Sequence, residues 1–507
     1  MNSAAARELY KKREPIYPKL VRGKFRKLKW FLLFGTLAVY YLLPWVRWPR
    51  GLDEPSQAVL VDFEGGRFYF FFIEIWPSEL YYVTGLLILA AVGLFLATAL
   101  LGRIWCGYTC PQTVWTDLFI AAERLIEGDR NQRIRLAKAP WSFDKIRKKV
   151  AKHAIWLLIA AMTGGAWILY FHDAPTIVRH FFTGEAPGSA YLFASILTFT
   201  TYTLAGTMRE QVCTYMCPWP RIQAALTDEE TLQVSYRGAR GEPRGPHKKG
   251  EPWEGRGDCI DCKACVSACP MGIDIRDGDQ LECINCALCI DACDEIMAKV
   301  ARPTGLIAYD THRNLNSSNR SDDTGDGSFK GSSRALKLIR SRTVFYAFVF
   351  VVVATVMLIG LSNRTSMEVS VLRDRTPPFV TLSDGSIRNA YTLKITNKLN
   401  TEREFTVSLK GDRHYDMQVV GEKVVREENS QFVKVKVAGD GSRSTRIFAT
   451  LPSNANQKDP NMEDYPVEGS MPLQFLVSVG TGVAGDQTGD QSIDQTRYDT
   501  VFLTKRP

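Results

Sequence analysis

The stretch CIDCKACVSACPMGIDIRDGDQLECINCALCIDAC, Cys259 to Cys293, holds eight of the 12 cysteines in this chain of 507 residues. It contains the pattern Cys-x2-Cys-x2-Cys-x3-Cys twice. This spacing is typical of ferredoxins with two 4Fe–4S clusters, in which the fourth cysteine of each run serves the other cluster. It predicts a ferredoxin-like module at residues 259–308. The predicted ligands are Cys259, Cys262, Cys265 and Cys293 for one cluster and Cys283, Cys286, Cys289 and Cys269 for the other.

The rival interpretation is a tetrathiolate zinc site, because Cys-x2-Cys pairs also bind zinc. The complete double pattern argues against zinc. Pro270 follows the first run and Asp294 follows the second, so we expect the second loop to differ in shape while its ligands stay the same. No cysteine lies beyond Cys293, whereas a secreted disulfide framework would place cysteines throughout an exported part. The cysteines are therefore expected to be metal ligands in a reducing compartment.

Long apolar runs lie on both sides of this module. Each is close to the 20 or so residues that cross a bilayer as a helix. They predict a four-helix membrane region at 30–208 and a fifth helix at 343–361. Residues 1–29 are polar and basic and show no cleavage site, so the first run is expected to be an anchor. The five runs lie near Trp30–Trp48, Leu80–Leu101, His153–Phe171, Ala190–Met208 and Thr343–Leu361.

The positions of Lys and Arg predict the orientation in the membrane. Basic residues gather before the first run and between the second and third runs, whereas loop His172–Ser189 has only Arg179. The N-terminus, the linker 209–258 and the ferredoxin-like module are therefore expected to be cytoplasmic. An odd number of spans places the C-terminal part outside. The basic run Arg124–Lys152 fits this orientation signal, and we expect no nucleic-acid partner.

Beyond the fifth run the apolar period changes from helical to two. Segments such as YTLKIT (391–396), FVKVKVAG (432–439) and LQFLVSV (473–479) alternate and are separated by turn residues. They predict an immunoglobulin-like β-sandwich at 362–507 without a disulfide. The polar stretch 309–342 before the fifth run is expected to be a flexible linker. The aromatic stretch RFYFFFIEIWP (67–77) is too short to span and is expected to lie in the outer membrane interface.

Two matched cysteine pairs follow the second and fourth runs. They lie in CGYTCP, Cys106–Pro111, and in CTYMCP, Cys213–Pro218. Because positions i and i+4 share a helix face, each pair could hold one ion, and soft thiolates select Cu(I), zinc or iron–sulfur clusters. A lone pair would more often be ordinary buried cysteine, but the duplication favours a metal or redox role. The four candidate residues are Cys106, Cys110, Cys213 and Cys217.

Taken together, the paired CxxxCP motifs, the double ferredoxin motif, the fifth span and the outer sandwich resemble the CcoG family, also called FixG or RdxA. Its members are accessory proteins of cbb(3)-type cytochrome c oxidase in the bacterial inner membrane. The resemblance implies a cupric reductase with copper at the four CxxxCP thiols and electrons supplied by the two clusters. It also implies several partners. These are a cytoplasmic electron donor, a copper-exporting P-type ATPase, periplasmic copper chaperones, oxidase assembly factors and membrane lipid.

Two other functions stay open at this point. One is an electron carrier of NapH-like type between quinol and a partner reductase. The other is a non-enzymatic assembly scaffold that docks through the sandwich. The sequence also leaves open whether the four CxxxCP thiols form one site or two, whether they hold a further cluster, and whether the chain forms a homodimer.

Overall fold

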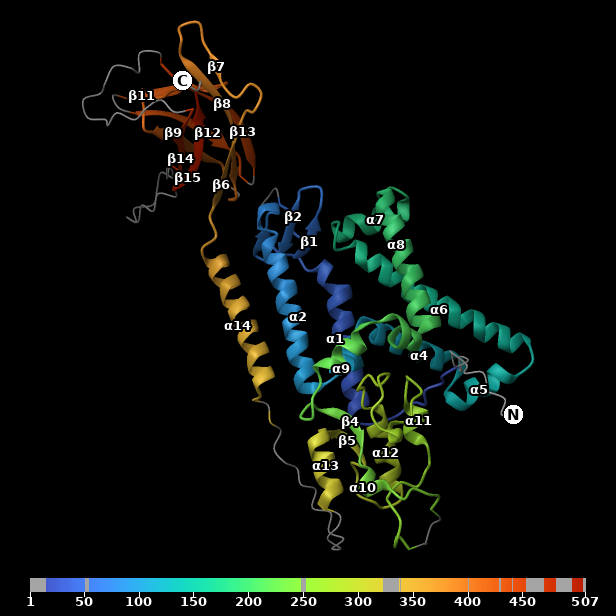
Figure 1. The fold of residues 1–507 in the computed structure, drawn as a ribbon. Coiled ribbons are helices and arrows are strands. Elements are labelled where there is room, and N and C mark those ends of the chain that lie inside the picture. Colours follow the sequence, from blue (N-terminus) through green and yellow to red (C-terminus); the bar gives the residue numbers. More distant parts are fainter. Residues whose placement is uncertain are drawn as a thin grey trace, which may run out of the picture. The chain divides into compact units, whose positions relative to one another are not determined.

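The computed structural model describes residues 15–50, 54–247, 252–321, 337, 339–399, 401–427, 430–439, 441–452, 469–479 and 495–504. The chain divides into two compact units, Met1–Leu358 and Ile359–Pro507 (Figure 1). The first unit contains the long helices and all 12 cysteines. The second unit is built of strands.

Four helices in the described part of the chain are long and apolar enough to cross a membrane. Their apolar side chains are largely exposed, for example Phe31 at 75% and Phe348 at 64%. Such exposure is expected where lipid replaces a protein core. These helices are α1 (Lys24–Leu42), α2 (Tyr81–Leu101), α6 (Phe143–Ile168) and α14 (Ser341–Ser362).

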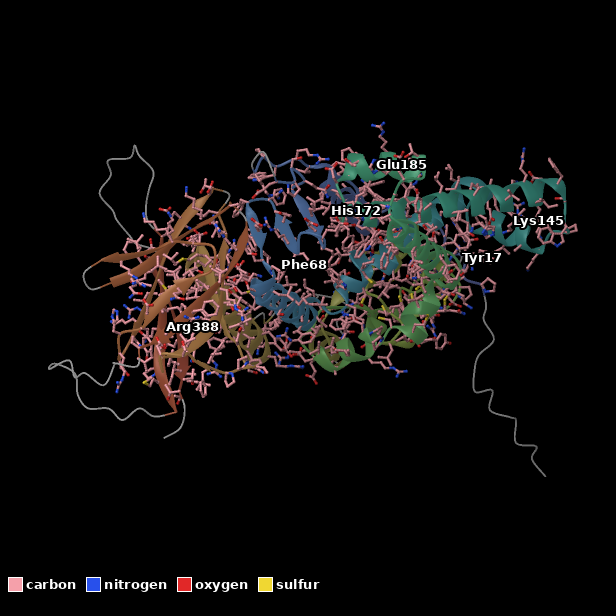
Figure 2. All side chains as sticks on the ribbon, turned by 90° about the horizontal axis from the view of Figure 1, so that it is seen from above. Tyr17, Phe68, Lys145, His172, Glu185 and Arg388 are labelled. Carbon is pink, nitrogen blue, oxygen red and sulfur yellow. The ribbon has the colours of Figure 1, made fainter. Side chains whose placement is uncertain are left out.

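The predicted span Ala190–Met208 is not a uniform α-helix, so the count of five spans is not confirmed. Helix α8 (Gly188–Thr201) has 14 residues and continues as the π-helix η3 (Tyr202–Met208). Fourteen α-helical residues rise only about 21 Å, less than the roughly 30 Å of a hydrocarbon core. The run packs closely beside α6, since a Cβ at Gly164 would lie 2.4 Å from the Ala194 carbonyl oxygen. Lys145, near the start of α6, and His172, four residues beyond its end at Ile168, are labelled in Figure 2.

Shorter elements connect the long helices. The predicted interface stretch 67–77 contributes two strands of a three-stranded antiparallel sheet, in which Phe68 lies opposite Val61 and Ile75 (Figure 2). These strands are β1 (Val59–Asp62), β2 (Arg67–Phe70) and β3 (Ile73–Ile75). The short helices are α3 (Ile104–Tyr108), α4 (Pro111–Glu127), α5 (Arg130–Lys138), α7 (Ala174–Thr183), the π-helix η4 (Val212–Met216), α9 (Trp219–Leu226) and α10 (Gly238–Gly241).

The cysteine-rich module is closed by a two-stranded ladder in which β4 (Gln233–Tyr236) pairs with β5 (Ile307–Asp310). Both strands lie at least partly in segments predicted as linkers, so that prediction is wrong there. Val234 and Ile307 are 2% and 1% exposed, and their burial explains why these flanks are ordered. Residues 322–336 of the predicted linker lie outside the described residues. The module's helices are α11 (Ala264–Ala268) and α12 (Leu288–Lys299), and α13 (His312–Ser321) follows.

Helix α12 caps the first long helix. The Asp291 carboxylate accepts hydrogen bonds from the backbone N–H groups of Phe25 (3.3 Å) and Arg26 (2.7 Å) at the start of α1. Gly23 makes this approach possible, because a Cβ there would lie 2.1 Å from Asp291 Cγ. The free N–H groups of a helix N-terminus are thus satisfied by a carboxylate from another element. The module is therefore fixed to the N-terminal end of α1.

We expect Asp291→Ala to loosen this end of α1. The variant leaves two buried N–H groups without acceptors, which costs about 1–3 kcal/mol. Amide hydrogen exchange at Phe25 and Arg26 should rise roughly 5- to 150-fold. Asp294→Ala is the matched control, because Asp294 lies on the same helix and accepts from Gly305 instead. Equal exchange at Phe25 and Arg26 in both variants would contradict the role of Asp291.

The second unit is a sandwich of two antiparallel sheets, and its strands coincide with the predicted alternating segments. Tyr391, Leu393 and Phe475 are fully buried between the sheets, and Arg388 lies on β8 (Figure 2). One sheet contains β6 (Met367–Arg373), β7 (Val380–Thr381), β8 (Ile387–Asn397), β10 (Asp416–Val419) and β13 (Ser442–Leu451). The other contains β9 (Arg403–Gly411), β11 (Val424–Glu427), β12 (Ser430–Val437), β14 (Ser470–Val479) and β15 (Gln495–Leu503).

Candidate metal centres

The structure gathers the eight module cysteines around two cavities, and the grouping is the one expected for exchanged fourth ligands. Cys293 comes from the second run but lines the cavity of the first. Cys269 comes from the first run but lines the cavity of the second. Cys265 lies in the wall between the two cavities. One cavity is lined by Cys259, Cys262, Cys265 and Cys293. The other is lined by Cys265, Cys269, Cys283, Cys286 and Cys289.

The two cysteine runs share an unusual backbone. Asp261 and Lys263 have φ values of 51° and 54°, and the matching Asn285 and Ala287 have 54° and 59°. Asp and Asn tolerate this left-handed conformation, but it costs residues such as Lys263 and Ala287 roughly 1–2 kcal/mol each. Strain of this kind persists where the surrounding structure imposes it, most often at binding sites. The repeated geometry indicates that both loops are built to hold the same kind of group.

The thiols themselves fit a cluster. Burial raises the pKa of Cys265 and Cys283 to about 11 and of Cys269 and Cys293 to about 12. Crowded thiols without water stay protonated until a cation replaces their protons. Backbone N–H groups of Met271 and Ile273 donate to the Cys269 sulfur, as is common around iron–sulfur ligands. Two sets of four soft donors in apolar surroundings therefore suit two 4Fe–4S clusters, which exchange single electrons when bound.

The two CxxxCP motifs do not place their cysteines on one helix face, so this prediction is wrong. Cys106 lies in α3, whereas Cys110 is extended (φ −58°, ψ 129°) and begins α4. Cys213 lies in the π-helix η4, and Cys217 is extended after it (φ −80°, ψ 122°). The reason is the proline that follows each second cysteine, because a residue before proline avoids the helical conformation.

Cys106, Cys110, Cys213 and Cys217 nevertheless come together, with Cys106 innermost. Burial, followed by repulsion from the other three thiols, raises the pKa of Cys106 to about 12. Burial and the nearby Cys110 and Cys217 raise the pKa of Cys213 to about 11. Cys106 is buried and Cys217 is exposed, so the group extends from the interior to solvent. Within the described residues, no three His, Cys, Asp or Glu side chains are already arranged around a single-ion site.

Two glutamines that the sequence interpretation missed join the halves of this group. Gln112 follows the first motif, and its Nε2 donates to the carbonyls of Leu204 (2.8 Å) and Arg209 (3.2 Å) before the second motif. These carbonyls belong to a stretch in which Arg209 has φ 46°. Gln223 is fully buried beyond the second motif and accepts a hydrogen bond from the Cys106 thiol at 3.2 Å. No sequence signal marks Gln223, because its partner lies 117 residues away.

The four-thiol group lies directly against the second cysteine set of the module. Cys106 belongs to one buried cluster with Cys286, Ile284 and Met271, and Cys213 and Cys269 pack against that cluster. The first set lies in a different core, where Cys259, Cys265 and Cys293 pack with Val234 and Ile307. Among the described residues, the buried cluster around Cys106 therefore contains cysteines of the second set and none of the first.

Comparison with known families agrees with this organisation. A family described as "4Fe-4S dicluster domain" matches residues 208–312, and one described as "4Fe-4S binding domain" matches residues 83–127. The second match contains Cys106 and Cys110. The family described as an IG-like fold at the C-terminal of FixG matches residues 357–500, which confirms the predicted sandwich.

Three relatives cover most of the chain. The nitrogen fixation protein FixG of Rhizobium meliloti is 49% identical over 89% of this chain and 89% of its own length. Protein RdxB of Cereibacter sphaeroides is 51% identical over 82% of this chain and 85% of its own. Protein RdxA of the same organism is 47% identical over 90% of this chain and 94% of its own. Together with the matched C-terminal domain, they show that this chain belongs to the FixG/RdxA family.

Proposed function

We propose that this protein is a membrane-bound iron–sulfur oxidoreductase that reduces Cu(II) to Cu(I) for the assembly of cbb(3)-type cytochrome c oxidase. Its copper site is the group formed by Cys106, Cys110, Cys213 and Cys217. The observation that supports this most strongly is the packing of Cys106 and Cys213 in one buried cluster with Cys286 and Cys269, two of the predicted iron–sulfur ligands. A metal substrate bound there lies next to a source of single electrons.

The chemistry of the thiols suits this reaction. Conversion of Cu(II) to Cu(I) takes up one electron, and thiolates stabilise the softer Cu(I) product. Cys217 is exposed and can meet an incoming ion first, whereas Cys106 is buried and excludes water from the product. Copper binding must displace the protons that burial holds on Cys106 and Cys213.

The contacts of the module support a cytoplasmic location for the site. The module binds the basic N-terminal end of α1 through Asp291, and basic segments stay in the cytoplasm. An electron donor and a copper-exporting P-type ATPase would then meet the protein on the cytoplasmic side. If the run Gly188–Met208 crosses the membrane beside α6, the sandwich reaches the periplasm. There it would meet copper chaperones and oxidase assembly factors. A homodimer is compatible with this arrangement.

The function is tested with protein purified without oxygen in detergent, reduced, and mixed with Cu(II) and a chelator specific for Cu(I). The parent should form about two Cu(I) per chain without further reductant, one for each one-electron cluster. Protein from which the iron has been removed should form much less. Equal yields from the two samples would contradict the proposal.

A second candidate function follows from the match of a 4Fe-4S binding family to residues 83–127. In this case the four thiols hold a further cluster, and the protein is a pure electron carrier. Iron content separates the two functions, because two cubane clusters contain eight irons and three contain 12.

A further inference from the structure

The first CxxxCP motif and the module approach each other so closely that two positions leave no room for a Cβ atom. A Cβ at Gly107 would lie 2.6 Å from the carbonyl oxygen of Ile284, and one at Gly102 would lie 2.8 Å from the Asn285 side-chain amide. Gly102 also has φ 60°, a conformation that favours glycine. The backbone around Cys106 therefore touches the loop between Cys283 and Cys286 directly.

Arg103 forms hydrogen bonds from the first CxxxCP motif to the loop before Cys283 and to Pro220. The two N–H groups of its Nη1 are shared among the carbonyls of Cys283 (3.0 Å), Gln280 (3.4 Å) and Leu281, and its Nη2 donates to the Pro220 carbonyl (3.3 Å). One half-buried guanidinium thus joins three cysteine-bearing segments. The planar fork of arginine suits this role, and a lysine ammonium could not reproduce it.

The second motif also packs near the module through Cys213, but in the described part of the chain its arginine makes no hydrogen bond to the Cys283 loop. Arg209 precedes Cys213 as Arg103 precedes Cys106, but it points into the helices. Its Nη2 donates to Glu123 (3.0 Å), and its guanidinium lies 5.1 Å from the Trp156 ring centroid. Thr214 stands where Gly107 stands in the first motif. Among the described residues, the hydrogen bonds to the Cys283 loop therefore come from Arg103 of the first motif.

We propose that Arg103 and Gly107 are positioning residues that hold the Cys283–Cys286 loop at a fixed separation from the four-thiol group, so that the second cysteine set alone serves this group. The proposal rests on the proposed function for its consequence in copper reduction, but the docking contact is independent of copper. The fixed positive charge lies near the Cys283 and Cys106 thiols and favours their anionic forms. It also favours the more negative, reduced form of a cluster that Cys283 binds.

Arg103→Gln tests the contact in the full chain with its iron bound. Hydrogen exchange of the segment 280–284 should rise at least tenfold, because three carbonyl bonds are lost. The electron paramagnetic resonance signal of one reduced cluster should shift while the other stays unchanged. The rate of Cu(I) formation should fall roughly 10- to 100-fold, because a displacement of reacting groups by about 1 Å slows a reaction by this much.

Three further variants separate the possible causes. Arg103→Lys keeps the charge without the fork, so the resonance signal should return toward that of the parent while exchange stays high. Gly107→Ala pushes the same surfaces apart without changing charge and should raise exchange alone. Arg342→Gln is the control, because this partly exposed arginine donates to the Ala225 carbonyl (3.2 Å), which lies outside the segment 280–284, and the variant should behave as the parent.

Unchanged exchange at 280–284 and an unchanged resonance signal in Arg103→Gln would overturn the proposal. Loss of about four irons would support it, since only the second set rests on this contact, and loss of all eight would count against it. If the parent does not reduce copper but exchange and resonance respond as expected, the copper function fails and the docking contact stands. If the parent reduces copper and the variants match it, the docking contact fails.

Discussion

Replacing only Cys106 and Cys110 with serine is expected to abolish high-affinity Cu(I) binding as completely as replacing all four CxxxCP cysteines. The reason is that Cys213 packs against the buried cluster that contains Cys106, so the proposed copper site takes thiols from both motifs. Serine is a hard oxygen donor that does not replace a soft thiolate. Cu(I) affinity, measured by competition with a chelator, should fall more than about 100-fold. This loss exceeds the roughly 10- to 100-fold loss of affinity that follows when only a hydrogen-bond partner of a metal ligand is removed.

The reciprocal variant, with Cys213 and Cys217 replaced by serine, should lose the same affinity. Tyr215→Phe is the control, because this side chain is exposed between the two cysteines and should leave copper binding unchanged. If each double variant instead kept half of the copper that the parent binds, the two motifs would form two separate sites.

Cys293→Ser is expected to remove the cluster of the first cysteine run, although Cys293 belongs to the second. Cys293 lines the cavity of Cys259 and Cys262. Iron should fall from about eight to about four per chain. The resonance signal that survives should match the one that survives in Cys262→Ser. Cys269→Ser and Cys289→Ser should share the other surviving signal.

If each variant instead lost the cluster of its own run, the exchange of fourth ligands would be refuted. A uniform loss of all eight irons in the four variants would show that the two clusters do not assemble separately. Iron and resonance measured on the same samples distinguish these results.

The sequence predicted the elements whose signals are local. The double cysteine motif predicted how the thiols divide between the two cavities, because ferredoxins of this spacing exchange their fourth cysteine. Membrane-length apolar runs identified α1, α2, α6 and α14, and the alternating segments identified the sandwich strands. Each of these signals lies within one continuous stretch of sequence, the longest being the 35 residues from Cys259 to Cys293.

The errors arose where neighbouring residues or distant contacts decide the conformation. The i and i+4 interpretation of Cys106 and Cys110 ignored the effect of Pro111 on the preceding residue. The segments around β4 and β5 looked like polar linkers, but they pair with each other across the whole module. The change from α8 to the π-helix η3 accompanies the side-chain bonds of Gln112, which comes from another helix.

The contacts that build the candidate site left no trace in the sequence. Asp291 reads as a spacer between two cluster ligands, yet it caps α1. Arg103 precedes the first CxxxCP motif, and no local pattern predicts that it joins this motif and Pro220 to the Cys283 loop. Pairings of this kind follow from tertiary structure, which brings together residues more than 100 positions apart.

The most direct test of the proposed function measures iron and newly formed Cu(I) on the same reduced samples of the parent and of a variant with serine at Cys106, Cys110, Cys213 and Cys217. The proposal predicts about eight irons in both proteins, with Cu(I) formation in the parent and almost none in the variant. Equal rates of Cu(I) formation would show that copper is reduced without the four thiols and would contradict the assignment of the copper site.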